Sequence, residues 1–300
     1  MGDAYTGVAD DVNAISYNPA GLALLRRQEL ALMHNEYVQG IRQEYMAYAF
    51  PGEGWGTVGV SANLLNVSPF AAYDANDLPM DSVSAQDTAL SAAYAVKYRS
   101  LALGIAGKYL NSRLDTVRAR GQACDLGALW SPHWQLRLGA SLQNLGPGVR
   151  FIDEAYPLPL TGKLGFSYLA PLSAGNTYVL IAAEGSFPRD RSPFPSGGLE
   201  FVFSNVVSAR VGYQGNQDAG LGLTAGAGIK IVRRGFTWLS YSEYPDWVPE
   251  LEVDYAFVNM GLLGNSHRVG ILARFGGAAR VKAGESKTFE RYQSVFYGRE

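Results

Sequence analysis

The sequence has little charge and almost no sulfur chemistry. Charged residues make up 17% of its 300 residues and the formal net charge is −2, whereas soluble domains usually carry about 25% charged residues. This near-neutral balance provides no electrostatic basis for binding nucleic acid. Cys124 is the only cysteine, which excludes an internal disulfide and a metal site built from several cysteines.

The sequence also lacks long hydrophobic runs. No stretch approaches the roughly 18 consecutive apolar residues that a membrane helix needs, although 47% of the chain is hydrophobic. No secretory leader is visible, because Met1 is followed directly by Gly2 and Asp3. Low charge, 18 tyrosines and 35 glycines without a helical span suit a membrane barrel whose strands alternate apolar and polar residues. Composition alone leaves a large soluble all-β protein open as well.

What the sequence does contain is a repeated period of two. In residues 57–64, 134–143, 220–231 and 267–275, largely apolar residues alternate with polar or small ones. Side chains on a strand point to opposite faces in turn, so each stretch has one apolar and one polar face. Runs of about 10 residues match a tilted strand that crosses a bilayer, and they exceed the roughly 5 or 6 residues of a strand in a soluble fold. The pattern therefore favours a transmembrane barrel.

We expect about 14 antiparallel strands in an all-β barrel. The expected strands are 28–37, 43–50, 55–65, 88–98, 101–111, 120–130, 134–144, 161–170, 176–186, 196–203, 206–213, 220–231, 251–258 and 266–275. Long polar loops are predicted at 66–87 and 145–160, and tight turns at 98–100 and 131–133. Short turns on one side and long loops on the other are the layout of outer-membrane barrels. An even strand count then places both ends of the barrel on the periplasmic side.

Three segments depart from this pattern. Residues 1–27 do not alternate: residues 4–12 predict a short helix, and the proline of the Asn18-Pro19-Ala20-Gly21 motif favours a turn. We therefore expect three parts, namely a hatch at 1–27 that plugs the lumen, the barrel at 28–275, and a polar periplasmic tail at 276–300. The aromatic segment 233–250 is either a periplasmic excursion or an extended start of the thirteenth strand.

The inward-facing positions of the expected strands include six basic residues. Burying such charges is costly unless they are paired or hydrated, so we expect a polar, partly wet lumen in which Asp and Glu residues of the hatch pair with them. The predicted hatch contacts are Asp10, Asp11, Asn13, Asn18, Pro19, Ala20 and Gly21, and the predicted lumen-facing bases are Arg137, Lys163, Arg210, Lys230, Arg268 and Arg274. The alternate glycines of 220–228 are expected to make room for the hatch.

Neither a metal, a cofactor nor a catalytic group is expected. Asp10, Asp11 and Asn13 lack the spacing of a calcium loop and fit capping better. The three histidines have no ligand neighbour at three or four residues. The sequence also contains no Gly-x-Ser-x-Gly nucleophile elbow, so we expect no enzyme activity.

Both ends of the expected barrel resemble a known family. Residues 1–23, with the Asn18-Pro19-Ala20-Gly21 motif, are similar to the N-terminal hatch of the PorV/PorQ family of outer-membrane proteins, which are related to the FadL transporters. Residues 253–257 and 263–269 resemble that family's last hairpin. The resemblance implies a 14-stranded FadL-like barrel. The chain departs from it in the missing leader, the segment 233–250 and the tail beyond Phe275.

Two functions follow as expectations from this resemblance. The first is a non-enzymatic component of protein secretion or surface assembly, as in type IX secretion, with protein partners bound by its loops. The alternative is a FadL-like channel for the uptake of hydrophobic small molecules. The polar lumen slightly favours the first. Both place the chain in the lipid of a bacterial outer membrane, with its leader removed or truncated.

Overall fold

A computed structural model describes residues 1–73, 76–151, 154–172, 176–216, 220–231 and 249–276. The predicted tail therefore lies outside the described residues except for Gly276, and so does most of the aromatic segment 233–250. No helix in these ranges is both long and apolar enough to span a membrane.

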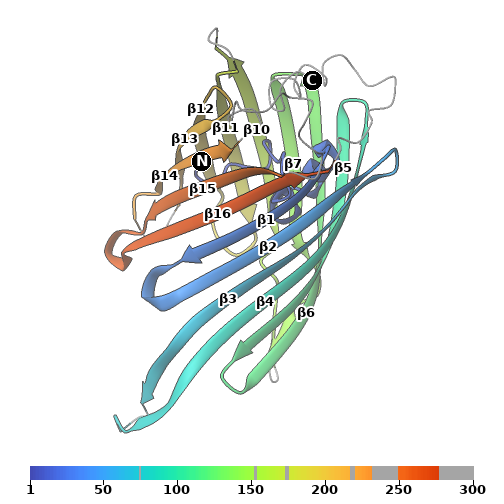
Figure 1. Cartoon of the computed structure of the whole chain (residues 1–300). Coiled ribbons are helices and arrows are strands. Elements are labelled where there is room, and N and C mark those ends of the chain that lie inside the picture. The colour runs from blue at the N-terminus through green and yellow to red at the C-terminus, as the bar shows by residue number, and fades with distance from the viewer. Residues whose placement is uncertain (74–75, 152–153, 173–175, 217–219, 232–248, 277–300) are drawn as a thin grey trace.

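Fourteen strands form a closed antiparallel barrel, which confirms the predicted fold (Figure 1). Along the chain these are β1 (Gln28–Glu36), β2 (Ile41–Gly52), β3 (Gly56–Tyr73), β4 (Pro79–Tyr98), β5 (Leu101–Leu114), β6 (Val117–His133), β7 (Leu136–Leu145), β10 (Thr161–Pro171), β11 (Tyr178–Pro188), β12 (Phe194–Phe203), β13 (Val207–Gln214), β14 (Leu223–Ile231), β15 (Glu250–Asn259) and β16 (Asn265–Phe275). Each pairs with the next, and β1 closes the ring on β16 in register from Gln28 opposite Phe275 to Glu36 opposite His267.

The period of two in the sequence becomes the two faces of the wall. On β5, Leu103 and Ile105 are exposed to the outside, whereas Ala102 and Ala106 are buried towards the lumen. An apolar exterior and a lumen of small and polar residues are the arrangement of a membrane barrel.

The predicted loop at 66–87 is wrong. β3 continues to Tyr73 and β4 begins at Pro79, with register shifts near Phe70, so this region is a tall hairpin (Figure 1). Backbone pairing persists although the side chains become polar, because above the membrane both faces of a strand can meet water. The predicted loop at 145–160 contains a small separate hairpin of β8 (Val149–Phe151) and β9 (Glu154–Tyr156). Two connections contain the 3-10 turns η2 (Val38–Gly40) and η4 (Gly261–Leu263).

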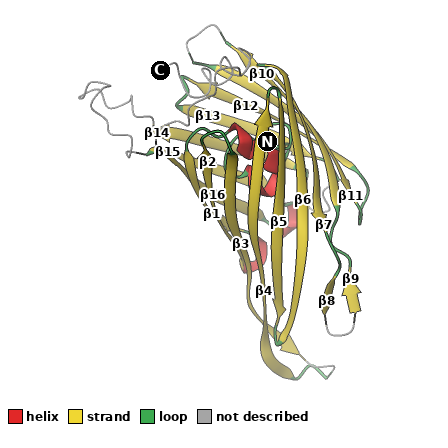
Figure 2. Cartoon of the chain, turned by 90° about the vertical axis from the view of Figure 1, so that its right-hand side faces the viewer, coloured by secondary structure: helices red, strands yellow, loops and turns green. Residues whose placement is uncertain are grey.

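The hatch lies inside the barrel, where its helices are enclosed by the strands (Figure 2). Its helices are α1 (Ala14–Tyr17) and the 3-10 helix η1 (Pro19–Leu24). The helix predicted at 4–12 is wrong: these residues form turns, and Ala9 has a positive φ angle of 23° that interrupts a continuous helix.

Hydrophobic packing fixes the hatch to the wall. Ile15 and Leu22 are fully buried, and they belong to one cluster with Ala47 and Ala95 of the barrel and Leu272 of β16. Complete burial of an aliphatic side chain contributes about 1.5–3 kcal/mol. The core of this molecule is therefore the contact between hatch and barrel.

Candidate functional site: the hatch and the cavity beside it

One side of the lumen is lined by glycines where the hatch touches it. A Cβ added at Gly104 would overlap Pro19 and Ala20, and one added at Gly139 would overlap the backbone of Thr6. Glycines with such contacts occur on seven strands, and we call them the glycine cradle: Gly59, Gly104, Gly127, Gly139, Gly165, Gly198 and Gly212. The cradle runs from β3 to β13 and lets the hatch backbone lie directly on the wall.

The glycines of 220–228 have a different role, so the expectation that they accommodate the hatch is wrong. A Cβ at Gly228 would meet Asp254 and Ser208, and one at Gly226 lies nearest to Tyr255. These glycines therefore make room for neighbouring barrel strands and the charged side chains of the lumen.

Asn18 holds the hatch in shape and ties it to the wall. Its fully buried side chain donates from Nδ2 to the carbonyls of Thr6 (2.9 Å) and Ala128 on β6 (3.1 Å), and its Oδ1 accepts from the N–H of Ala20 (3.3 Å). Pro19 and Ala20 contact the cradle, and Gly21 packs on Ala9 within the hatch. The structure thus places three residues of the predicted motif in the hatch–wall contact, and the fourth, Gly21, in the packing of the hatch itself.

Two of the six predicted bases clamp the hatch. Lys163 lies 3.1 Å from Asp3 of the hatch and 3.0 Å from Glu184 of β11. Arg137 lies 3.5 Å from Asp10 and donates to the carbonyl of Val8 at 2.7 Å.

The hatch backbone also binds directly to a barrel carboxylate. Glu184 accepts from the N–H groups of Tyr5 (3.1 Å) and Thr6 (2.9 Å). This acid was not among the residues predicted from the sequence, although the alternation on its strand predicts an inward position for it.

Arg210, Lys230 and Arg274 form ion pairs with acidic residues of the barrel. The expectation that acidic residues of the hatch would pair with them is therefore wrong. Arg210 bonds to Asp254 and lies 2.6 Å from Glu200. The full set of acids in these pairs is Glu29, Glu200, Glu250, Glu252 and Asp254. Their alternation on β15 was the available signal, because Glu250, Glu252 and Asp254 share one face.

The remaining predicted residues are placed differently. Arg268 faces the lumen and forms no ion pair with any residue the structure describes. Asp11 accepts from the backbone and side-chain nitrogens of Asn13, at 2.7 and 3.0 Å, so both residues shape the hatch turn.

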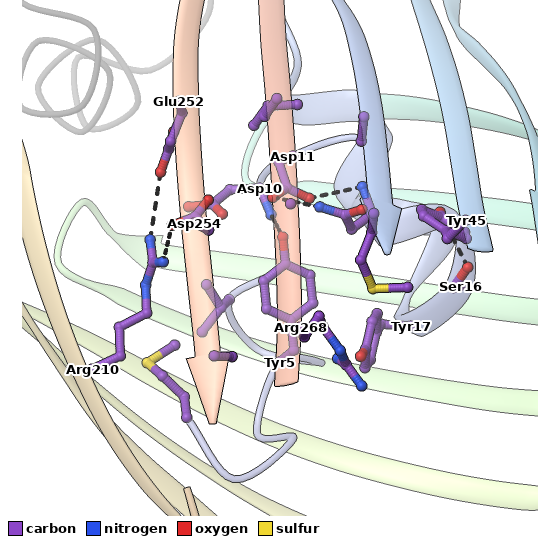
Figure 3. Close-up of a pocket in the computed structure, with 18 of the residues that line it drawn as sticks. Tyr5, Asp10, Asp11, Ser16, Tyr17, Tyr45, Arg210, Glu252, Asp254 and Arg268 are labelled. Carbon is purple, nitrogen blue, oxygen red and sulfur yellow. Dashed lines mark hydrogen bonds and ion pairs between the residues drawn. The ribbon is translucent and has the colours of Figure 1, made fainter. Parts of the chain in front are cut away.

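A cavity of about 570 Å³ lies between the hatch and the side of the barrel away from most of the cradle (Figure 3). The hatch contributes Tyr5, Asp10 and Tyr17 to its lining, and the barrel contributes residues of β1, β2 and β11–β16 together with Asn63 of β3. Figure 3 shows Arg210 pointing at Glu252 and Asp254, and Ser16 at Tyr45, whose oxygens are 3.3 Å apart.

The lining is mixed in character. Met33, Val8 and Leu180 supply apolar surface, while Arg268 and Gln43 supply polar groups. The cavity can therefore contact both halves of a molecule that has an apolar body and a polar group.

Asp10 of the hatch has a carboxyl group whose pKa is shifted by its surroundings. Burial raises the pKa of Asp10 to about 6, and Arg137 opposes that rise. Among the described residues, no group of three or more His, Cys, Asp or Glu side chains is arranged to hold a metal ion.

The comparisons with known proteins agree with this architecture. The model of an uncharacterised protein family, UPF0164, matches residues 1–106, which span the hatch and the first strands. No curated protein matches the sequence.

Several solved structures share the fold. The Ralstonia pickettii toluene transporter TbuX is 13% identical, with 92% of this chain and 98% of that chain covered and a TM-score of 0.56. The Pseudomonas putida toluene transporter TodX is 12% identical, with 91% and 96% covered and a TM-score of 0.55. A Pseudomonas aeruginosa FadL homologue is 12% identical, with 91% and 97% covered and a TM-score of 0.53.

At these identities the likeness shows the fold alone. It gives no support to the PorV/PorQ assignment in particular or to a role in secretion. The chain therefore has the fold of a FadL-like outer-membrane β-barrel, closed by fourteen strands around an N-terminal hatch.

Proposed function

We propose that this chain is a non-enzymatic channel of the bacterial outer membrane that admits small, largely hydrophobic molecules bearing a polar group. The observation that carries the proposal is the cavity of about 570 Å³ beside the hatch. Its volume lies within the roughly 300–1,000 Å³ of small-molecule sites.

The position of the cavity beside the hatch supports passage of a small molecule through the barrel, and not only its binding there. The hatch leans on the glycine cradle, so its movement away from the cradle would take it across the cavity. In the two clamps, the hatch members Asp3 and Asp10 have side chains 37% and 23% exposed, whereas the barrel members Lys163 and Arg137 are buried. Both ion pairs join the hatch to the barrel and neither joins two barrel strands, so they can open without unfolding the barrel.

The two transporters named above are described as carrying toluene. For this chain we infer a related but more polar molecule, because Tyr17, Tyr45 and Arg268 border the cavity. Aromatic rings packed against tyrosines, with one hydroxyl directed at the charged wall, would satisfy both kinds of surface.

Saturation-transfer NMR on the purified chain in detergent, with toluene and 4-methylphenol as probes, tests this proposal. We expect both to receive saturation and 4-methylphenol to bind more tightly. Ala256 lines the cavity and Val253 of the same strand faces outwards. Ala256→Trp should therefore abolish binding and Val253→Trp should preserve it. Equal binding by the two variants would refute a ligand site in the cavity.

The secretion role expected from the sequence has no specific observation in its favour. At the hairpin end of the barrel, where β1 joins β2, β3 joins β4 and β5 joins β6, the described connections form pairs of strands and short turns. Two of the similar structures reported above are described as toluene transporters. The channel is therefore the function that the structure supports best.

A further inference from the structure

Three arginines form an exposed basic patch on the outer face of the β5–β6 hairpin. They are Arg113 on β5 and Arg118 and Arg120 on β6. All three are exposed, and they have the opposite parity to Lys108 and Asp125, which pair inside the lumen at 2.5 Å. The patch therefore faces away from the barrel axis.

The register of the two strands makes this patch unfavourable by itself. Arg113 stands directly opposite Arg118, and Arg120 stands opposite Asn111. Like charges directly opposite one another destabilise a sheet. Arg113 donates from Nε to the carbonyl of Asp115 (2.9 Å), but none of the three arginines forms an ion pair within the described ranges.

In the β1–β2 hairpin at the same end of the barrel, basic side chains on the outer face lie opposite acidic ones. There Glu36 is opposite Arg42 with 3.4 Å between Oε2 and Nε, and His34 is opposite Glu44 with 2.7 Å between Nδ1 and Oε1. Outward charges on that hairpin are matched across the strands. The unmatched arginines on β5–β6 therefore call for an anion from outside the chain.

The height of the patch indicates where that anion lies. The apolar outer positions of β5 end at Tyr109, whose partner on β6 is Gln122. Towards the hairpin turn, Arg120 lies two residues beyond Gln122. Arg113 and Arg118 each lie four residues beyond the Tyr109–Gln122 pair. At about 3.4 Å per residue on a strand tilted by roughly 40°, these positions lie about 5–10 Å beyond the apolar band. The headgroup layer occupies roughly the first 5–8 Å there. Arg120 therefore lies at headgroup level, and the long side chains of Arg113 and Arg118, just beyond it, can reach back to the same layer.

We propose that Arg113, Arg118 and Arg120 bind the phosphates of anionic lipid headgroups in the leaflet at the hairpin end. Guanidinium groups form paired hydrogen bonds with phosphate oxygens. Two or more phosphates between the opposed arginines would convert their repulsion into attraction. This inference is independent of the proposed channel, because the patch and the cavity lie on opposite faces of the wall.

Native mass spectrometry of the full chain, released from nanodiscs of phosphatidylcholine and phosphatidylglycerol in equal parts, tests the proposal. We expect the wild-type chain to retain phosphatidylglycerol in preference to phosphatidylcholine. The variant R113Q/R118Q/R120Q should lose that preference. We expect a loss of about fivefold for each arginine, which is the usual contribution of one basic side chain to the affinity for an anionic membrane surface. The preference should also weaken at high salt.

Arg42→Gln is the matched control, since Arg42 is exposed at the same end but already paired with Glu36. It should retain phosphatidylglycerol like the wild type. An unchanged preference in the triple variant, or an equal loss in R42Q, would overturn the proposal. Displacement of the lipid by inorganic phosphate at the same phosphate concentration would also overturn it, by showing a site for free phosphate.

Thermal unfolding in phosphatidylcholine alone keeps the test independent of folding. Removal of opposed like charges should leave the triple variant at least as stable as the wild type there. Adding phosphatidylglycerol should raise the melting temperature of the wild type but not that of the variant. A parallel rise in both would count against a specific patch.

Discussion

At the scale of single residues, the contact between hatch and wall depends on the absence of side chains. Gly104 of β5 faces Pro19 and Ala20 of the hatch, whereas Gly107 of the same strand has no atom within 4 Å of an added Cβ. Gly104→Ala should loosen the hatch at a cost of about 1–3 kcal/mol, the usual range for overpacking. Hydrogen exchange at the hatch amides should accelerate roughly tenfold or more.

Gly107→Ala is the control from the same strand and should leave hatch exchange unchanged. Equal exchange rates in both variants would mean that the glycine cradle does not set the position of the hatch. Global unfolding measured on the same samples separates hatch release from damage to the barrel.

The hatch should also respond to pH through one carboxyl. Burial raises the pKa of Asp10 from 3.8 to about 6, so the docked hatch holds this proton more tightly than a released one. Docking should therefore strengthen as pH falls through 6 towards 4, and this gain should be absent above about pH 7. Exchange at the amides of 5–12, corrected for intrinsic rates, should be several-fold slower at pH 5 than at pH 8.

Asp10→Asn should remove most of that difference, because the amide does not titrate. Asp3→Asn changes another hatch acid, one that pairs with Lys163, and should retain it. A pH response that persists in D10N but vanishes in D3N would contradict the prediction, because it would assign the effect to Asp3 and not to Asp10.

Strand parity was the basis for predicting which side chains face the lumen. Parity placed Arg137 and Lys163 in the lumen, and the structure has them there. Their partners could not be predicted equally well, because pairing depends on which strands are neighbours around the ring. Glu184 and Glu252 were missed for that reason: each has its partner on another strand.

At the scale of elements, the alternation predicted the strands but not their ends. Polarity at 66–87 suggested a loop, yet β3 and β4 pair up to Tyr73 and Pro79. The periodic signal requires one apolar face, and it disappears where a strand leaves the membrane although backbone pairing continues. The helix predicted at 4–12 was misplaced for a different reason: Ala9 has a positive φ angle within that range, and α1 begins only at Ala14.

Strand β1 connects the closure of the barrel to the hatch through Glu29. Its Oε1 accepts from Nε of Arg274 on β16 (3.1 Å), and its Oε2 accepts from the N–H of Val12 (2.9 Å). Glu29→Ala should leave that N–H buried without its acceptor, at a cost of about 1–3 kcal/mol. Thermal unfolding in detergent should detect the loss.

Glu36→Ala on the same strand provides the comparison. Glu36 is exposed and pairs with Arg42 at 3.4 Å, and exposed pairs contribute about 0–1 kcal/mol. The melting temperature should therefore fall clearly for E29A and little for E36A. Equal changes would show that the link to Val12 has no stabilising effect.

At the scale of the whole molecule, the lumen is asymmetric. The hatch rests on small residues on one side and faces a charged, hollow wall on the other. Charged pairs on that wall, such as Arg210 with Glu200, are held by barrel strands alone. The wall could therefore keep its shape if the hatch moved, as the proposed channel requires.

Deletion of residues 2–24 should convert the closed barrel into an open pore. The ring of strand pairs does not include the hatch, so the barrel should still form, although with a lower melting temperature, because the cluster around Ile15 and Leu22 is lost. Single-channel recording in planar bilayers should show a large, steady conductance that the full chain lacks. Arg137→Gln combined with Lys163→Gln keeps the hatch but removes both clamps, and it should give brief openings of similar size. Heat-modifiable gel mobility verifies that each barrel is folded, and a folded deletion variant that conducts no better than the full chain would show that the hatch does not close the lumen.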